Sequence, residues 1–191
     1  MAIYCSSHER SMYEDQSYWR SLPELVPSVV FHTREQGADG EYYWRDLTSY
    51  ELFANKQVLI FSLPGAFTPT CSTYQLPDFE KMAEDFYTLG IDLICCISMN
   101  DSFVMNAWAK ANNLENILVI PDGSGVFTEG MMMQVTKDNL GFGRRSWRYA
   151  ALVNNGRITD WFIEENKEDN IKEDPYHYTR PQYIFEQLDE I

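Results

Sequence analysis

The chain has 191 residues, of which 45% are hydrophobic and 23% are charged, and its formal net charge is −14. This length and balance are those of a globular domain that can bury a sizeable core. An acidic chain lacks the basic surface that nucleic acid and anionic membranes require, so neither is expected as a partner. The sequence also lacks a run of roughly 18–20 apolar residues and the apolar core of a secretory signal, which predicts a cytoplasmic protein.

The first elements can be taken in chain order. Residues 1–25 are polar and aromatic without a clear period, and we interpret them as an N-terminal extension. A single domain is predicted for residues 26–191. It begins with strands at residues 29–33 and 41–44. A capping-box pattern at residues 48–51 then predicts a short helix, because the hydroxyl and the carboxylate satisfy each other's backbone N–H groups.

The next strand leads into the stretch on which the functional prediction depends. An apolar run at residues 58–63 predicts a buried strand, and the Pro-Gly pair that follows ends it. Thr68 is then expected as a helix N-cap, with Pro69 in the first turn and Cys71 two residues later. At this place the free N–H groups and the helix macrodipole favour a cysteine thiolate over the thiol. The alternative is that Cys71 is an apolar packing residue, as most free cysteines are.

The remaining elements alternate between strand and helix. Pro77 predicts a kink in the helix that follows Cys71, and an Asn-Gly pair at residues 155–156 predicts a tight hairpin. The acidic segment 164–175 is expected as solvated surface. Further strands are predicted at residues 91–98, 117–120, 147–153 and 158–163, helices at residues 103–111, 126–133 and from 181 onward, and a loop at residues 136–146. This order predicts an α/β fold, in which a central mixed sheet has helices on both faces.

Three further cysteines are present, at positions 5, 95 and 96, and none follows a zinc-ligand spacing. Cys95 and Cys96 are neighbours in a strand, so their side chains are expected on opposite faces of the sheet. A disulfide between adjacent residues would be strained, and the apolar surroundings favour a core role over a redox role. Cys5 is interpreted as an incidental exposed thiol.

Three features around Cys71 favour the reduction of a peroxide. The Thr68 hydroxyl, three residues before the cysteine, can reach both the sulfur and a bound oxygen. The N–H groups of Gly65 and Cys71 lie close to the sulfur, and the arginines of residues 143–148 can supply a cation. Together these groups would align a peroxide with the thiolate and stabilise charge on the leaving oxygen, so that the cysteine becomes a sulfenic acid.

Residues 64–72, with the sequence PGAFTPTCS, resemble the active-site motif of the peroxiredoxins, and of the type-5 (plant type II) class in particular. The resemblance runs from about residue 29 to residue 176 and includes residues 98–108, 121–125 and 141–149. It is strongest to bacterial members that are linked to glutathione and glutaredoxin. The resemblance implies a thioredoxin-like fold and a thiol peroxidase that reduces hydrogen peroxide and alkyl hydroperoxides. It also implies a homodimer and no metal, haem or nucleotide cofactor.

The resemblance further implies roles for individual residues. Cys71 matches the peroxidatic cysteine, Thr68 the threonine that orients the peroxide, and Pro64 the proline that shields the sulfur. Arg148 matches the active-site arginine, and Arg145 a second arginine that supports it. The alternative for both arginines is solvated surface charge. A tuned thiolate needs a nearby cation, which favours a place for Arg148 in the site.

An apolar wall for alkyl hydroperoxides could come from Phe67 and from other aromatic and methionine residues. These others are Phe127, Phe142, Met131, Met132 and Met133. The alternative is that most of them belong to the core or to a dimer contact. The loops around Phe67, Ser102 and residues 139–142 are the candidates for that contact.

The last expectation concerns how oxidised Cys71 is reduced again. Some type-5 members carry a second cysteine near the C-terminus, whereas residues 97–191 contain none. We therefore expect a one-cysteine mechanism that is recycled by glutathione and glutaredoxin, with thioredoxin as the alternative reductant. Two other functions stay open: a peroxide sensor that passes oxidation to a partner, and a non-catalytic holdase. The three histidines fall in no recognisable motif, so a His-assisted hydrolase and a zinc site are not supported.

Overall fold

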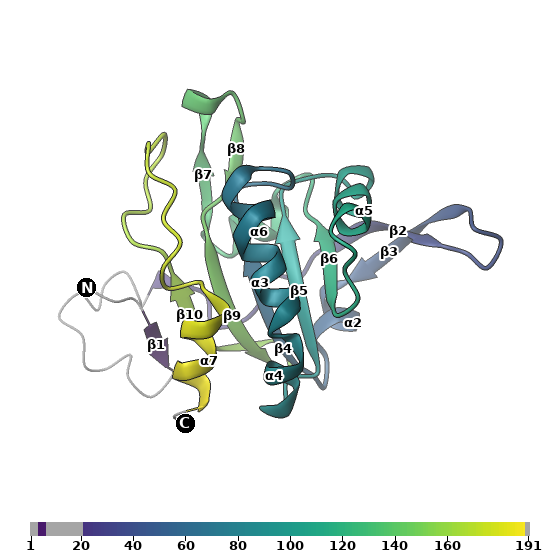
Figure 1. Cartoon of the computed structure of the whole chain (residues 1–191), viewed down its shortest axis with the longest axis horizontal. Helices are drawn as coiled ribbons and strands as arrows, with labels where there is room; N and C mark the ends of the chain where they lie inside the picture. Colours follow the sequence, from purple (N-terminus) through teal and green to yellow (C-terminus); the bar gives the residue numbers. More distant parts are fainter. Residues whose placement is uncertain (1–3, 7–20, 190–191) are drawn as a thin grey trace.

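The computed structural model describes residues 4–6 and 21–189. Its centre is a six-stranded sheet in the order β1-β10-β9-β4-β5-β6 (Figure 1). The strands of this sheet are β1 (Tyr4–Ser6), β4 (Gln57–Ser62), β5 (Leu93–Ser98), β6 (Ile117–Pro121), β9 (Tyr149–Asn154) and β10 (Arg157–Ile163). Strands β4, β5 and β6 run parallel, while β9 pairs antiparallel with both β4 and β10, and β1 pairs antiparallel with β10. The sheet is therefore mixed, as predicted.

Helices cover both faces of the sheet, which confirms the predicted α/β architecture. One face packs against α3 (Leu76–Lys81), α4 (Ala83–Thr88), α5 (Ser102–Ala111) and α7 (Pro181–Asp189). In Figure 1, α3 and α4 lie across this face. The other face packs against α2 (Ser49–Phe53) and α6 (Val126–Gly130). Because both faces are covered, the side chains of β4 are buried from Val58 to Ser62.

The adjacent cysteines of β5 face opposite layers, as expected. Cys95 belongs to the apolar cluster on the side of α2 and α6, and Cys96 to the cluster on the side of α3 and α4. Both side chains are fully buried. Burial raises the pKa of Cys95 and of Cys96 well above the ordinary thiol value. The core interpretation of both residues is confirmed.

Two local predictions are also confirmed in detail. The Thr48 hydroxyl accepts the N–H of Glu51, and the Glu51 carboxylate accepts the N–H of Thr48, so a complete capping box starts α2. In the turn between β9 and β10, Asn155 and Gly156 have φ angles of 48° and 80°. This left-handed pair is the conformation that a type I′ hairpin needs.

Two hairpins stand outside the central sheet (Figure 1). β2 (Val30–Gln36) pairs with β3 (Tyr42–Thr48), and both strands are longer than predicted. β7 (Gln134–Thr136) pairs with β8 (Arg144–Ser146), in a segment that was predicted largely as loop. That loop prediction is wrong at both ends, because strands of three residues carry too little alternation to be recognised. The predicted helix at residues 126–133 ends earlier, at Gly130.

Parts of the first 25 residues pack onto the rest of the chain. Strand β1 extends the sheet beside β10, and Leu22 is buried in the cluster on the side of α2. The division into an extension of residues 1–25 and a domain of residues 26–191 stays a prediction. The interpretation of Cys5 as an incidental exposed thiol also stays a prediction, because its side chain is not among those that the structure describes. Among the described residues, no helix is both long enough and apolar enough to span a membrane.

Candidate active site

The chain leaves β4 and enters a helix where the sequence predicted it. Helical residues begin at Pro69, and the carbonyl of Thr68 accepts the N–H of Ser72. The segment Cys71–Gln75 then forms a π-helical turn, in which the N–H of Leu76 donates to the carbonyl of Cys71. A π turn holds one more residue than an α turn, and such turns often occur at functional sites.

Pro77 explains why the helix is irregular here. Proline has no N–H and its ring clashes with the carbonyl four residues earlier, so a regular α-turn cannot form across it. The sequence predicted a kink, whereas the structure shows the wider π turn before Pro77 and a second break at Met82, between α3 and α4. The result is a short irregular segment that presents Cys71 at its first residue.

Cys71 is fully buried, and its sulfur faces a buried arginine. Arg148 directly precedes β9, is 1% exposed, and places its Nη1 atom 3.5 Å from the Sγ atom of Cys71. A guanidinium keeps its charge at any relevant pH, so it can stabilise a thiolate without competing for its proton. Pro64, the predicted shield of the sulfur, is buried in the loop before the helix. The structure thus brings together two segments that are far apart in sequence.

Four further groups hold the Arg148 guanidinium. Its Nη1 atom also donates to Oε1 of Gln75, Nη2 donates to Oδ1 of Asp174 at 2.6 Å, and Nε donates to the carbonyl of Pro175 at 3.0 Å. The ring of Tyr176 lies 5.7 Å from the guanidinium carbon, within cation–π range. Burial lowers the pKa of Arg148, but the adjacent sulfur and the Asp174 carboxylate more than offset this and raise it. The cation is therefore fixed in both charge and orientation.

Asp174 belongs to the segment 164–175, which was expected to be solvated surface. That expectation is wrong for Glu164, whereas Asp174 is exposed and is nevertheless paired with the buried Arg148. Glu164 is 1% exposed, and its Oε1 atom accepts the N–H groups of His177 and Thr179. This buried carboxylate ties the start of the segment to the residues that follow it, so the segment forms a closed loop. Sequence alone shows only a run of acids, because the pairing arises from the tertiary fold.

Hydrogen bonds hold the loop before the helix at two places. Both the N–H and the hydroxyl of Thr68 bond to the carbonyl of Gly65, at 3.4 Å and 2.8 Å. The N–H of Ala66 donates to Oδ1 of Asn100 at 2.9 Å. Between these points, Phe67 has a φ angle of 62°, which bulky residues rarely adopt, and its side chain is 56% exposed. The bonds around Phe67 hold this strained conformation in place.

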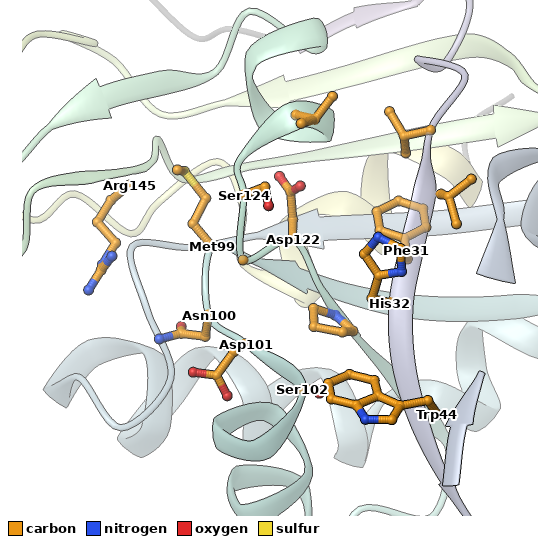
Figure 2. Close-up of a pocket in the computed structure, with 15 residues that line it drawn as sticks. Phe31, His32, Trp44, Met99, Asn100, Asp101, Ser102, Asp122, Ser124 and Arg145 are labelled. Atoms are coloured by element: carbon orange, nitrogen blue, oxygen red, sulfur yellow. The ribbon is translucent and has the colours of Figure 1, made fainter. Parts of the chain in front are cut away.

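Arg145 lies against Gly65. Its Nε atom lies 3.6 Å from the position that a Cβ on Gly65 would occupy, and it has no hydrogen-bond partner among the described residues. Its guanidinium lies 5.7 Å from the ring centre of Phe142, and burial lowers the pKa of Arg145. Both Arg145 and Asn100 line a hollow of about 570 Å³. Figure 2 shows Arg145 on the same side of this hollow as Asn100. No hydrogen bond joins Arg145 to Arg148 in the described part of the chain, and the predicted support of Arg148 by Arg145 stays a prediction.

Comparisons with known proteins agree with this geometry. The Redoxin family matches residues 44–177. A peroxiredoxin of Sinorhizobium fredii is 54% identical over 171 residues, which cover 87% of this chain and 91% of that protein. The chain belongs to the peroxiredoxin family. Peroxiredoxins reduce peroxides with a thiol, so the protein is a thiol peroxidase with a thioredoxin-like fold.

Two further comparisons are with a second relative in sequence and with a solved structure. The hybrid peroxiredoxin hyPrx5 of Haemophilus influenzae is 54% identical over 142 residues, which cover 74% of this chain and 57% of that protein. The crystal structure of the Plasmodium falciparum antioxidant protein, a 1-Cys peroxiredoxin, has a TM-score of 0.84 and 35% identity. That likeness covers 87% of this chain and 98% of the Plasmodium chain. The predicted resemblance to peroxiredoxins is confirmed.

Sequence reasoning missed two buried residues near the active site of this peroxiredoxin. Gln75 is fully buried, and its Nε2 atom has no partner among the described residues. Its spacing of four from Cys71 was an available signal, because such residues share one side of a helix. Lys137 is 3% exposed, with Nζ 5.4 Å from the ring centre of Trp147. Burial lowers the pKa of Lys137, while Asp174 raises it. No local pattern marks Lys137, because its surroundings are set by the fold.

The residues considered for an apolar wall separate into two groups. Phe127, Met131 and Met133 are fully buried in the cluster on the side of α2 and α6, so the core interpretation is confirmed for them. Met132 is 44% exposed, and Phe142 lies beside Arg145. In the described part of the chain, no three His, Cys, Asp or Glu side chains are grouped to hold a metal ion.

Proposed function

We propose that Cys71 is the peroxidatic residue and that the protein reduces hydrogen peroxide and alkyl hydroperoxides through it. The observation that carries the proposal is the 3.5 Å contact between Nη1 of Arg148 and Sγ of Cys71 in a buried site. Burial alone would disfavour a negatively charged sulfur. A permanently charged guanidinium at this distance attracts negative charge on the sulfur, and the thiolate is the nucleophilic form of a cysteine.

In the proposed reaction, the thiolate attacks one peroxide oxygen. The S–O bond forms as the O–O bond breaks, and the second oxygen leaves as water or alcohol after taking up a proton. The hydroxyl of Thr68 and the N–H groups of Gly65 and Cys71 hold the peroxide in line with the sulfur. Arg148 stabilises the negative charge that develops on the leaving oxygen. Pro64 shields the resulting sulfenic acid from solvent.

Two predicted residues are assigned to the surroundings of the peroxide. Arg145, whose Nε atom has no partner among the described residues, places positive charge beside Gly65. The side chain of Phe67 is 56% exposed and offers apolar surface next to the same loop. An alkyl group of a larger hydroperoxide would contact that surface.

The catalytic cycle is proposed to use one cysteine. Cys95 lies on the opposite side of the sheet from Cys71, and burial raises the pKa of both Cys95 and Cys96. Neither therefore supplies the thiolate that would resolve a sulfenic acid. Glutathione with glutaredoxin is the proposed reductant, and thioredoxin is the alternative. A cytoplasmic location is part of the proposal, because such a cycle needs a reducing compartment.

A homodimer is also part of the proposal. Three exposed apolar side chains lie in or next to the segments that the sequence marked as contacts: Phe67, Phe103 and Leu140, each 56% exposed. Protein interfaces are enriched in aromatic and other apolar side chains at their core, which supports contacts through these segments. Sedimentation of micromolar protein should give a dimer, and a monomer alone would contradict this part of the proposal.

Stopped-flow mixing of the reduced protein with equimolar hydrogen peroxide tests the central proposal. We expect the loss of one thiol per chain, far faster than free cysteine reacts, and no such phase in the Cys71→Ser variant. A rate no better than that of free cysteine would exclude an activated peroxidatic residue and favour a non-catalytic role. Mass spectrometry after one turnover should find one oxygen on Cys71. A disulfide from Cys71 to Cys95 or Cys96 would contradict the one-cysteine cycle.

A further inference from the structure

A second hollow, of about 530 Å³, lies next to the catalytic residues, and we call it the Arg180 pocket. It is lined by Thr70, Tyr74, Asp78, Asp174, Pro175, Tyr176, His177 and Arg180. Thr70 is the residue before Cys71 in the helix. Asp174 is the carboxylate that accepts a hydrogen bond from Arg148. The pocket therefore reaches Cys71 in two ways. Thr70 is its neighbour in the chain, and Asp174 is linked to it through the side chain of Arg148.

Tyr176 forms the wall between the pocket and the catalytic arginine. Its ring centre lies 5.7 Å from the guanidinium carbon of Arg148 and 5.4 Å from that of Arg180. The Tyr176 hydroxyl donates to Oδ2 of Asp78 at 3.3 Å, and its carbonyl accepts Nε of Arg180 at 2.8 Å. Two hydrogen bonds and two cation–π contacts thus hold Tyr176 in place. They also fix the positions of Arg180 and Asp78 around the pocket.

The pocket carries charges of both signs. Arg180 is exposed, and no carboxylate of the described residues forms an ion pair with it. The carboxylates of Asp78 and Asp174 are 39% and 44% exposed. Arg180 is therefore a local source of positive charge at the edge of this pocket, in a chain with a net charge of −14. It would attract a carboxylate, while Asp78, whose Oδ1 atom lies 3.8 Å from Nζ of Lys81, would attract an ammonium group. Asp174 is already paired with Arg148.

We propose that the Arg180 pocket binds the low-molecular-weight thiol that reduces oxidised Cys71. The chemistry fits a small peptide thiol with both carboxylate and ammonium groups, of which glutathione is the example. One carboxylate would pair with Arg180 and the ammonium group with Asp78. This inference rests on the proposed function, because it requires the sulfenic acid of Cys71 as the acceptor.

The reduction would proceed in two steps. The thiolate of the bound peptide attacks the sulfenic sulfur, an S–S bond forms, the S–O bond breaks, and the hydroxide leaves as water after taking a proton. A second peptide thiol then attacks the peptide sulfur of the mixed disulfide and releases Cys71 as a thiolate. Since Cys71 is fully buried before oxidation, the segment Asp174 to Tyr176 or the first helical turn must shift for this attack.

Binding is tested first with S-methylglutathione, which has the charges of glutathione but no free thiol. Titration of the reduced protein, followed by NMR, should shift the signals of residues around the Arg180 pocket. Arg180→Ala should weaken this binding by about fivefold or more, and Arg180→Lys should restore part of it. The matched control is Arg157→Ala, which removes an exposed arginine that is paired with Glu24. Saturable binding that is equal in wild type and Arg180→Ala, or shifts confined to another surface, would overturn the assignment.

Re-reduction kinetics test the same site independently. The sulfenic acid is formed with one equivalent of peroxide and reduced either with glutathione or with uncharged 2-mercaptoethanol. Arg180→Ala should lower the rate constant for glutathione by about fivefold relative to that for 2-mercaptoethanol, and Arg157→Ala should leave this ratio unchanged. An unchanged ratio in Arg180→Ala would contradict binding of the thiol in the Arg180 pocket, and so would a wild-type protein that is reduced by 2-mercaptoethanol but not by glutathione. Neither result would contradict the proposed peroxidase activity. Failure of peroxide to oxidise Cys71 would instead overturn the proposed function.

Discussion

Arg148 and Asp174 form an ion pair of 2.6 Å in which the arginine side chain is 1% exposed and the aspartate side chain is 44% exposed. They are 26 residues apart in sequence. The pair therefore joins the buried floor of the active site to a loop at the surface. Because the arginine also contacts Cys71, the surface loop can affect the sulfur of Cys71 without touching it.

The first prediction concerns Asp174. If its carboxylate acts by orienting Arg148, then Asp174→Ala should slow the oxidation of Cys71 by hydrogen peroxide about fivefold, because one charge-assisted hydrogen bond is lost. Asp174→Asn keeps an acceptor oxygen and should stay close to the wild-type rate. Stopped-flow measurements on both variants check this, with Glu173→Ala as the control for an adjacent exposed acid. Equal rates for the Ala and Asn variants would argue against a positioning role.

The second prediction concerns the identity of the cation. Arg148 makes bonds through Nε, Nη1 and Nη2 at once, which the compact ammonium of lysine cannot reproduce. Arg148→Lys should therefore slow peroxide reduction by about 100-fold, in the range found when one preorganised donor is removed from an active site. Arg144→Lys, at an exposed position of β8, serves as the control. An oxidation rate within twofold of wild type would show that charge alone is sufficient.

The third prediction concerns Gln75, whose Oε1 atom accepts a hydrogen bond from the Arg148 guanidinium. Gln75→Glu would place a buried carboxylate beside the sulfur, and a nearby negative charge disfavours a thiolate. The midpoint of the rate–pH profile for peroxide oxidation should then move to higher pH. Gln75→Met, of similar size and without charge, should lower the rate without moving the midpoint. Identical profiles for wild type and Gln75→Glu would contradict the assigned contact.

The fourth prediction concerns stability at alkaline pH. Burial raises the pKa of Cys95 in the folded protein, whereas in the unfolded chain the thiol ionises above about pH 8.5. The folded state then binds more protons, so the free energy of unfolding falls as pH rises above that value, by up to about 1.4 kcal/mol per pH unit for this thiol. Cys95→Ala should therefore lose stability less steeply between pH 9 and 10.5.

Urea unfolding under reducing conditions, from pH 7.5 to 10.5, measures this difference. Val58→Ala is the control, because it removes a fully buried side chain from the same cluster without removing an ionisable group. Its stability should be lower than that of wild type by a constant amount across the range. If the curve of Cys95→Ala also ran parallel to wild type, the ionisation of Cys95 would not contribute.

The features predicted well from sequence are those set by neighbouring residues. The capping box at Thr48, the turn at Asn155 and the opposite facing of Cys95 and Cys96 all depend on contacts or periodicity within a few positions. The strand–turn–helix around Cys71 belongs to the same class, since the prolines and the glycine of residues 64–69 act locally. These features were sufficient to predict the fold class and to select Cys71 as the candidate nucleophile.

The features that were missed depend on segments that meet only after folding. In sequence, Asp174 is one acid in an acidic run, and the contacts that shape this run, among them those of the buried Glu164 carboxylate, form only after folding. Lys137 has no distinctive neighbours in sequence, yet it is 3% exposed beside Trp147. The π turn at Cys71–Gln75 was predicted only as a kink, because a proline marks where a helix is disturbed but not how.

This π turn makes the direction of the sulfur depend on a count of residues. Each residue of an α-helix turns the chain by about 100°, and the π turn contains one residue in excess. If the same residues instead closed as a regular α-helix while α3 kept its packing, the turn would no longer absorb the excess residue. Cys71 would then be rotated by about 100° around the helix axis, away from Arg148. Pro77, which prevents the regular turn, thus determines the direction in which the sulfur of Cys71 points.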